Sequence, residues 1–297
     1  MRVFVTGATG FIGSAVVADL IGAGHQVLGL ARSEGGALAL ATAGAQVHRG
    51  TLEDLESLKR GAASSDGVIH LAFNHDFSRY AENCEDDRCA IDAIGSVLVG
   101  SGRAFLATGG IATIAVGRPA TEEDSSAPST LAPRAASEEA ALALAARGVN
   151  ASVVRLPQVH DRDKHGLVTL AIEAAREKGV SAYIGDGQNR WPAAHVLDVA
   201  RLYRLALERA ERGARWHAVA EEGVAMRDIA EAIGRRLGVR TASIAPEAAS
   251  DHFGWLAAFA TFDMPASSIL TQKRLGWRPI GPGMVADLEQ LRVLERS

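Results

Sequence analysis

The amino-acid sequence predicts an α/β fold: a doubly wound parallel sheet, followed by a smaller, helix-rich C-terminal lobe. The first observation is that residues 1–13 read as an apolar strand that runs into three glycines spaced G-x-x-G-x-x-G. The second is a regular alternation of strand and helix patterns through residues 1–157, which is typical of a parallel sheet covered on both faces. The third is the length of 297 residues, enough for one large or two modest domains.

The glycine-rich turn predicts a dinucleotide site. Strand, glycines, an apolar helix face over 15–21 and a second strand at 26–30 follow one another within about thirty residues, the length that a βαβ unit needs. The glycines permit the tight turn, close approach of a pyrophosphate, and close packing of helix on strand. The helix N-terminus offers unpaired N–H groups to the phosphates. We therefore expect cofactor contacts from Gly7, Thr9, Gly10, Phe11, Ile12 and Gly13.

The elements of the first half follow in order. Periodicity predicts strands at 45–49, 67–72, 103–107 and 151–156, and helices at 37–43, 52–62, 79–99 and 134–147. Residues 118–133 are rich in Pro, Ser, Thr, Asp and Glu and are expected to form a surface loop. Ligands of such sheets bind outside the carboxyl ends of the strands, where the strand order reverses.

The second half is predicted to contain helices at 167–178, 197–210 and 226–237, a short strand and turn at 180–187 and a strand at 215–220. Residues 191–196 lead into the second helix, whose N-cap could be Asp198 or a near neighbour. Residues 160–165 form a polar loop expected at the ligand edge. We expect a nucleotide domain over 1–157, to which 191–220 return, and a substrate lobe made of 158–190 and 221–297.

The end of the second strand indicates which cofactor binds. An acidic residue there would bind the adenosine ribose hydroxyls and repel a 2′-phosphate. The chain instead has Arg32 and Ser33, a guanidinium and a hydroxyl that can hold that phosphate, which predicts NADP(H). The alternative is an ordinary surface arginine. Further cofactor contacts are expected along the strand ends, from Ala31, Thr51, Leu52, Leu71, Ala72, Phe73 and Thr108.

Composition argues against several other classes. The net charge of −4, without a basic block, argues against nucleic-acid binding. No apolar run reaches the ~18–20 residues of a membrane span, and no signal peptide is recognisable, so we expect a cytoplasmic protein. Cys84 and Cys89 lie about 140° apart on a helical wheel, and free thiols are expected. His160 and His165 bracket two aspartates but lack a second ligand pair, so no metal is expected.

Five segments resemble the extended short-chain dehydrogenase/reductases, and they occur in family order along the whole chain: Thr6–Gly13, Val68–Ala72, Arg155–Pro157, His195–Ala200 and Leu275–Pro279. The resemblance implies a Rossmann domain, a nicotinamide cofactor and a C-terminal substrate lobe. It also implies that Pro157, Gln158 and Val159 meet the nicotinamide carboxamide through their backbone.

The chain departs from this family at its catalytic motif. The family uses Tyr-x-x-x-Lys and an upstream Ser or Thr, but the matching helix has Arg134 and Glu138 in the place of the tyrosine and lysine. The upstream hydroxyl falls on Gly109 or Gly110, with Thr108 nearest. Arg134 and Glu138 are four apart, so we expect them to pair with each other and Arg134→Ala to leave turnover largely intact. The chain therefore resembles an atypical member.

Two functions fit such a member. In the first, it is an NADPH-dependent ketoreductase that delivers a hydride to a carbonyl of an angucyclinone-like aromatic polyketide, with a non-standard proton source such as a phenol of the substrate. In the second, it is a non-catalytic NADP(H)-binding redox sensor or scaffold. A sugar epimerase or dehydratase is a weaker third possibility, because no replacement base is evident.

Candidate site residues each have a plainer alternative. His75 could donate a proton or bind a substrate oxygen, or be an ordinary loop histidine. Thr108 could hydrogen-bond the carbonyl, or be satisfied locally. Aromatic residues of 253–262 could roof the pocket, or pack in the core. His195 and Asp198 are expected to support the strand-to-helix corner. Expected substrate contacts are Asn74, His75, Gly110, Ile111, His160 and Trp191.

The expected ligand is a small aromatic ketone. The helix at 79–99 carries an acidic face that reads as solvated rather than buried in an interface, which favours a monomer or a loose homodimer.

Overall fold

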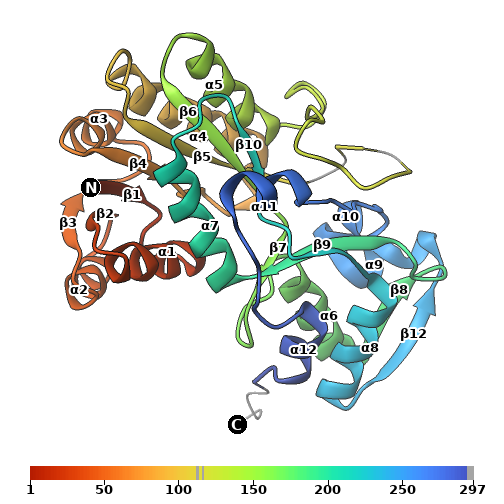
Figure 1. Ribbon diagram of the computed structural model, residues 1–297. Coiled ribbons are helices and arrows are strands. Elements are labelled where there is room, and N and C mark those ends of the chain that lie inside the picture. Colours follow the sequence, from red (N-terminus) through yellow and green to blue (C-terminus); the bar gives the residue numbers. More distant parts are fainter. Residues whose placement is uncertain (112–113, 116, 293–297) are drawn as a thin grey trace.

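A seven-stranded parallel sheet forms the centre of the molecule, in the order β10-β6-β5-β4-β1-β2-β3. The computed structural model describes residues 1–111, 114–115 and 117–292 (Figure 1). The strand order reverses between β1 and β4. The strands are β1 (Arg2–Thr6), β2 (Gln26–Ala31), β3 (Gln46–Arg49), β4 (Gly67–His70), β5 (Ala104–Gly110), β6 (Asn150–Leu156) and β10 (Arg215–His217).

Helices cover both faces of this sheet, as Figure 1 shows. They are α1 (Phe11–Gly22), α2 (Glu34–Thr42), α3 (Leu55–Ala63), α4 (Tyr80–Ser96), α5 (Ala135–Ala146) and α7 (Val196–Arg209). One core cluster joins the sheet to α1, α2 and α7, and a second joins it to α3, α4 and α5. The central strands are buried on both sides and read as continuous apolar runs, which is the pattern of a parallel sheet between two helical layers.

Local sequence explains where these helices begin. The Ser33 hydroxyl accepts a hydrogen bond from the Gly36 amide at the start of α2, and Asp54 does the same for the Ser57 amide at the start of α3. Side-chain caps of this kind satisfy amides that have no partner inside the helix. The helix α1 differs, because its N-cap is Gly10 and no side chain caps it. Its first amides are therefore left for a ligand.

The second lobe has its own sheets and core. Strand β9 (Arg190–His195) lies between β7 (Gln158–His160) and β11 (Glu221–Ala225), and β8 (Val180–Ile184) pairs with β12 (Arg240–Ile244). Its helices are α6 (Val168–Lys178), α8 (Met226–Leu237), α9 (Ala249–Phe253), α10 (Ala257–Ala260) and α12 (Met284–Glu289), with α11 (Ile269–Leu275) near α7. A separate apolar cluster fills this lobe.

The segment 191–220 is divided between the two parts. The helix α7 packs on α1, and β10 extends the central sheet. The strand β9 instead joins the small sheet. The N-cap of α7 is His195, whose Nδ1 accepts from the Leu197 amide. The expected lobe range 221–297 includes residues 293–297, which lie outside the described residues.

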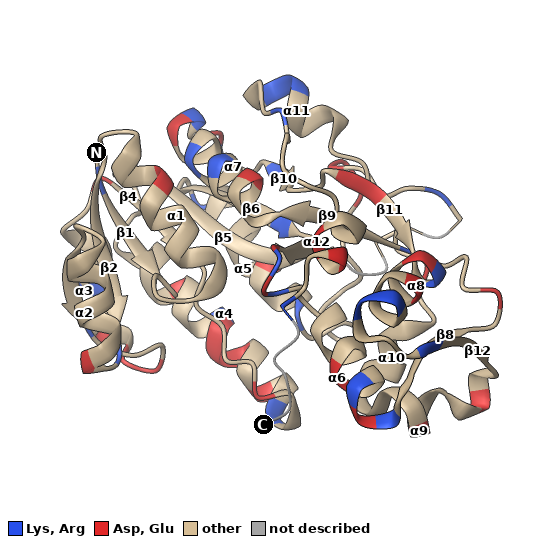
Figure 2. Cartoon of the chain, turned by 90° about the horizontal axis from the view of Figure 1, so that it is seen from below, with Lys and Arg blue, Asp and Glu red and all other residues tan. Residues whose placement is uncertain are grey.

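Charged side chains of both signs are interspersed over the elements that Figure 2 draws, with acidic residues along α4. Cys84 is buried, Cys89 is half-buried, and both are free thiols. No helix in the described part of the chain is long and apolar enough to cross a membrane.

Candidate functional site

A cavity of about 550 Å³ opens at the carboxyl ends of β1, β4 and β5, beside the glycine-rich turn. This is the point where the strand order reverses, and ligands of doubly wound sheets bind there. The cavity continues under the second lobe, from which Trp255, Phe259 and Met264 contribute. Of the residues expected at the site, the lining contains Gly7, Gly10, Phe11, Ile12, Gly13, Leu71, Phe73, His75, Thr108, Gly110, Ile111, Pro157, Gln158 and Val159.

The geometry of the glycine turn fits a pyrophosphate. Gly7 has a φ of +64°, and a Cβ there would stand 2.7 Å from the Ala72 amide nitrogen. A Cβ on Gly13 would stand 2.0 Å from the Gly7 carbonyl oxygen. A Cβ on Gly10 would meet only that same carbonyl, at 3.2 Å, so the turn is otherwise open on this side. The uncapped amides of α1 and this open side together suit the phosphates of a nicotinamide dinucleotide.

The end of β1 is tied to the end of β4 by Thr6. The Thr6 hydroxyl oxygen accepts from the amides of Leu71, at 3.1 Å, and Ala72, at 3.2 Å. It also lies 2.8 Å from Nδ1 of His70, to which it donates its proton. Nε2 of His70 then donates to Asp87 at 3.0 Å. The buried chain fixes the backbone that passes beneath the cavity.

The other residues expected to contact the cofactor lie at or after the ends of β1, β2, β3 and β4 and outside the cavity lining. Arg32 is exposed and has no partner among the described residues. Ser33 uses its oxygen to cap α2, which leaves its hydroxyl proton free. The Thr9 methyl group lies close to the same helix start. The remaining members are Ala31, buried in β2, the exposed Thr51, the half-buried Leu52 and the half-buried Ala72.

The expected ion pair between Arg134 and Glu138 does not form. Arg134 turns toward Asp87 on α4, with 2.8 Å between Nη1 and Oδ2, and its Nη2 donates to the Thr108 carbonyl at 2.9 Å. Its guanidinium also lies over the Phe73 ring, 4.4 Å from the centroid. Arg134 is thus a cavity residue, and the expectation that Arg134→Ala leaves turnover intact loses its basis.

Asp87 belongs to the face of α4 that was expected to be solvated, but its side chain is fully buried. Burial opposes ionisation, yet the Arg134 charge and the hydrogen bonds from His70 and Ser137 hold the pKa of this carboxyl below its usual range. Asp87 is therefore charged, and it fixes Arg134 in place. The sequence offered no sign of this pairing, because 47 residues separate the two partners.

Glu138 has different partners. Its carboxylate accepts two hydrogen bonds from the buried Arg155, at 2.6 and 2.8 Å, and one from Arg215 at 2.8 Å. Burial raises the pKa of Glu138, but the hydrogen bonds and charge of Arg155 outweigh it and hold this pKa below its usual range. Glu138, which was expected in the place of the family's lysine, is therefore a carboxylate that is already neutralised.

Thr108 lines the cavity, but its hydroxyl is used locally. It donates to the His70 carbonyl at 2.6 Å and lies 2.8 Å from the Tyr203 hydroxyl, which must then be the donor in that contact. A hydroxyl has one proton. Thr108 therefore has none to give to a substrate carbonyl, and the plainer alternative describes it better than a catalytic role.

One wall of the cavity is aromatic. His75 and Phe77 line it beside Tyr80, and the Phe77 ring stacks on Trp255 with 4.1 Å between centroids. Trp255 also contacts Phe259, which places part of the 253–262 segment over the pocket. Burial, and then the charge of Arg134, lower the pKa of His75. The imidazole is therefore neutral at pH 7.

Sequence reasoning missed Tyr80. Its ring lies 6.4 Å from that of Phe73, and burial raises the pKa of its hydroxyl. It is a protonated phenol in the cavity wall at neutral pH. The spacing of aromatic residues between 73 and 80 was the signal in the sequence that could have revealed it.

Three expected substrate contacts lie elsewhere. His160 is fully buried, and its Nδ1 lies 2.7 Å from Asp287 of α12. Trp191 is fully buried and donates to the Phe262 carbonyl. Asn74 is exposed and accepts from the Asp76 amide. Within the described chain, no cluster of three or more His, Cys, Asp or Glu side chains is arranged to hold a metal ion.

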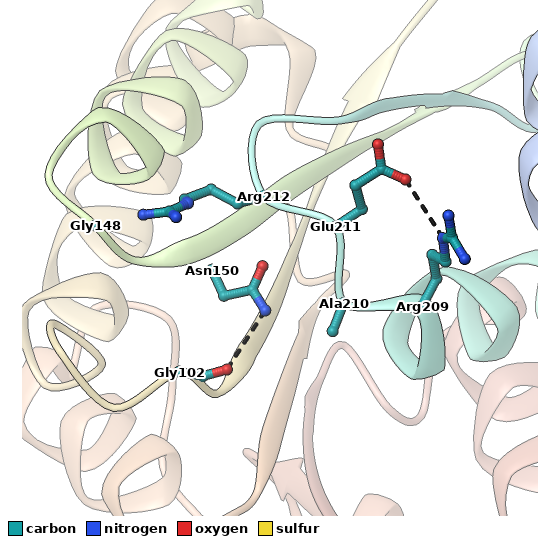
Figure 3. A pocket seen from close by; sticks show the side chains of 7 residues that line it. All are labelled: Gly102, Gly148, Asn150, Arg209, Ala210, Glu211 and Arg212. Carbon is teal, nitrogen blue, oxygen red and sulfur yellow. Dashed lines mark hydrogen bonds and ion pairs between the residues drawn. The ribbon is translucent and has the colours of Figure 1, made fainter.

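A second hollow, of about 470 Å³, lies at the opposite edge of the sheet, near the amino ends of β5 and β6. Figure 3 shows the Asn150 amide bonded to the Gly102 carbonyl and Arg209 paired with Glu211. None of the residues expected to bind cofactor or substrate lines this second hollow. The cavity at the glycine turn is therefore the candidate active site.

The fold and the cavity define a Rossmann-type protein with a second lobe that closes over the ligand edge. A solved structure with this fold is the dTDP-glucose 4,6-dehydratase DesIV from Streptomyces venezuelae, with NAD and TYD bound. The TM-score is 0.77 at 20% identity, over 98% of this chain and 96% of that one. The model of the NAD dependent epimerase/dehydratase family matches residues 3–219. The chain belongs to this family.

Two relatives illustrate the range of similar sequences. An uncharacterized protein of Schizosaccharomyces pombe is 49% identical over 289 residues, which is 97% of this chain and 98% of the relative. A 4-hydroxy-2-methyl-3-oxo-4-farnesyl-3,4-dihydroquinoline-1-oxide ketoreductase of Stigmatella aurantiaca is 30% identical over 224 residues, 72% of this chain and 66% of the relative.

Proposed function

We propose that this chain is an NADPH-dependent ketoreductase that reduces a carbonyl of an angucyclinone-like aromatic polyketide. The observation that carries the proposal is the aromatic wall of the cavity, where Phe77, Tyr80, Trp255 and Phe259 stand beside the glycine turn. Flat aromatic substrates gain from stacking on such rings. The Stigmatella relative, which is named for a 3-oxo dihydroquinoline, gives independent support for a ketone substrate.

The residues around the adenosine favour NADP(H). Arg32 is unpaired among the described residues, and the Ser33 hydroxyl proton is free at the start of α2. A guanidinium, a hydroxyl and a helix N-terminus together suit a 2′-phosphate. Glu34, the acidic residue that follows, is already paired with Arg49 at 2.6 Å.

When bound, the nicotinamide supplies the hydride, and the chain's own residues bind and orient the substrate. The stacked rings of Phe77 and Trp255 join the β4–α4 connection to the second lobe in the cavity wall. With Arg134 and Glu138 in the family's tyrosine and lysine positions, the proton must come from elsewhere. The two sources that fit are a phenol of the substrate beside its carbonyl and the Tyr80 hydroxyl in the wall.

The second candidate function is a non-catalytic NADP(H)-binding redox sensor or scaffold. The observation that favours it is the internal pairing of Arg134 with Asp87 and of Glu138 with Arg155, which stabilises the site without any ligand.

Turnover separates the two functions. The protein is incubated with NADPH and a panel of hydroxylated anthraquinones and angucyclinones, and the absorbance of the reduced cofactor is followed. Stoichiometric cofactor oxidation and a reduced product by mass spectrometry are expected. Tight NADPH binding without oxidation by any member of the panel would favour the sensor. The same panel with NADH is the control for cofactor preference.

A further inference from the structure

Arg134 occupies the place from which the family's tyrosine would act. It is the N-cap residue of α5, and its side chain is 21% exposed, toward the cavity that it lines. One face of the guanidinium is covered by the Phe73 ring. A planar cation against an aromatic ring, at the edge of an aromatic-walled cavity, is a group that a flat ligand can meet edge-on.

The guanidinium is held from behind. Nη1 donates to the buried Asp87 and contacts Ser137, and Nη2 donates to the Thr108 carbonyl. A guanidinium has five N–H donors. The Nε–H and the second hydrogen of Nη2 have no protein acceptor within the described residues.

The Asp87 carboxylate, which binds Arg134, is itself held in place by hydrogen bonds. Oδ1 of Asp87 accepts from His70, whose other nitrogen accepts from Thr6 at the end of β1. Thr6 donates to His70, and His70 donates to Asp87. The Asp87 carboxylate therefore needs no hydrogen bond from a group in the cavity. Donors held in this way need no reorganisation when charge develops in front of them.

The Arg134 charge also reaches the titratable groups around the cavity. After burial it is the second cause that lowers the pKa of His75, and it opposes the raised pKa values of Tyr80 and Cys84. These groups lie on the β4–α4 connection and on α4. The positive potential of Arg134 is therefore felt inside the cavity, although Asp87 balances it from behind.

We infer that Arg134 binds an anionic oxygen of the aromatic ligand, a phenolate or enolate, through its free N–H groups. An arginine stays protonated throughout the physiological range, so it cannot replace the tyrosine as an acid. Arg134 instead takes the place of the tyrosine as a positive charge that stabilises an anionic oxygen. The ligand class is then an aromatic carbonyl compound with an acidic hydroxyl group.

The catalytic part of this inference rests on the proposed function. A dihydronicotinamide bound beside the glycine turn would supply the hydride to the carbonyl carbon, and the π electron pair would move onto the carbonyl oxygen. Arg134 stabilises the alkoxide that forms. The alkoxide then takes a proton from water, from the Tyr80 hydroxyl or from a second hydroxyl of the substrate that is not ionised.

The binding part is tested without cofactor, with 4-nitrophenol as the probe. Its absorbance is titrated with pH, free and in the presence of the protein. We expect the pKa of the bound probe to fall, and the phenolate to bind about tenfold more weakly to Arg134→Gln than to wild type, as for loss of a charge-assisted hydrogen bond. Affinity for uncharged nitrobenzene should be unchanged. Arg134→Lys should restore part of the phenolate affinity.

Two further variants keep the test independent of folding. Arg134→Gln leaves the buried Asp87 without its arginine partner, so the double variant Arg134→Gln/Asp87→Asn removes both charges. Arg79→Gln, an exposed arginine that is paired with Glu82 near the cavity, is the matched control. Equal phenolate affinity in wild type and the double variant, or no shift of the probe's pKa in wild type, would overturn the inference. If the protein prefers the phenolate but reduces no ketone, the proposed ketoreductase function is refuted, whereas the inferred anion site at Arg134 is retained.

Discussion

The Arg32 guanidinium extends from the end of β2 into solvent, beside the start of α2. Ser33 and Thr9 lie next to it. The chain thus has an unpaired cation, a hydroxyl proton and a helix N-terminus at one place on its surface. Each suits a phosphate, and under the proposed function this place is where a 2′-phosphate of NADP(H) would bind.

We expect Arg32→Ala to weaken NADPH binding by roughly tenfold or more, the loss of a charge-assisted phosphate contact, while NADH binding changes little. Dissociation constants from isothermal titration calorimetry check this. Arg60→Ala, at an exposed position on α3, is the matched control. If Arg32→Ala lost no NADPH affinity relative to NADH, the assignment of NADP(H) would be refuted.

The residues of the glycine turn were predictable because their conformation is local. A positive φ at Gly7 and the 2.0 Å gap at Gly13 follow from a tight strand-to-helix turn. The partners of Arg134 and Glu138 were not predictable, because they come from other elements. Helical spacing made the i,i+4 pair the simplest expectation, but Asp87 and Arg155 are better placed and more deeply buried.

At the scale of elements, the corner between β9 and α7 connects the two lobes. Asp198, in the first turn of α7, accepts from the amides of Ile280 at 3.0 Å and Gly281 at 2.7 Å. Its backbone carbonyl accepts from the Trp277 indole at 2.9 Å. His195 and Asp198 were expected to support this corner. In the structure, Asp198 anchors a segment about eighty residues later in the chain.

We expect Asp198→Ala to loosen the 277–284 segment. Two amide donors lose a buried carboxylate, which costs about 2–4 kcal/mol for charge-assisted bonds. Hydrogen exchange followed by mass spectrometry should show faster exchange at residues 280 and 281 and unchanged exchange in β1 and β4. Asp228→Ala is the control, since Asp228 is also acidic in a first turn, that of α8. Equal protection of 280–281 in Asp198→Ala and wild type would contradict this anchoring role.

Most elements of the nucleotide domain were predictable from periodicity, since parallel strands that are buried on both faces read as apolar runs. The strand β12 was not, because Arg240–Ile244 is short and half-exposed. It is a strand because β8 pairs with it along five residues. The division of β9 and β10 between two sheets also depends on tertiary packing rather than on local pattern.

At the scale of the whole molecule, buried histidines join distant parts of the chain. Nδ1 of His217 lies 2.8 Å from the Ser267 carbonyl, so it carries the proton, and Nε2 accepts from Arg155 at 3.1 Å. His165 is also buried. Burial lowers the pKa of each to about 4, with the charge of Arg155 adding to the effect at His217.

This predicts loss of stability in mild acid. In the unfolded chain these histidines titrate near pH 6.5, whereas in the folded chain they titrate near pH 4. Between about pH 6.5 and 4 the unfolded chain therefore binds more protons than the folded chain. The stability is fully present above this window and falls through it, by roughly 3 kcal/mol for each histidine. Urea unfolding at several pH values measures the slope. His217→Gln should flatten it, and a slope unchanged by that substitution would contradict the assignment.

The contact between His160 and Asp287 spans 127 residues and has a consequence for synthesis of the chain. A ribosome releases β7 and β9 long before α12 exists. Until then the imidazoles of His160 and His195, whose rings lie 5.9 Å apart, have no carboxylate from Asp287 beside them. The central sheet can be completed once β10 has emerged, whereas the wall of the cavity that carries Trp255 and Phe259 cannot form before those residues have also emerged.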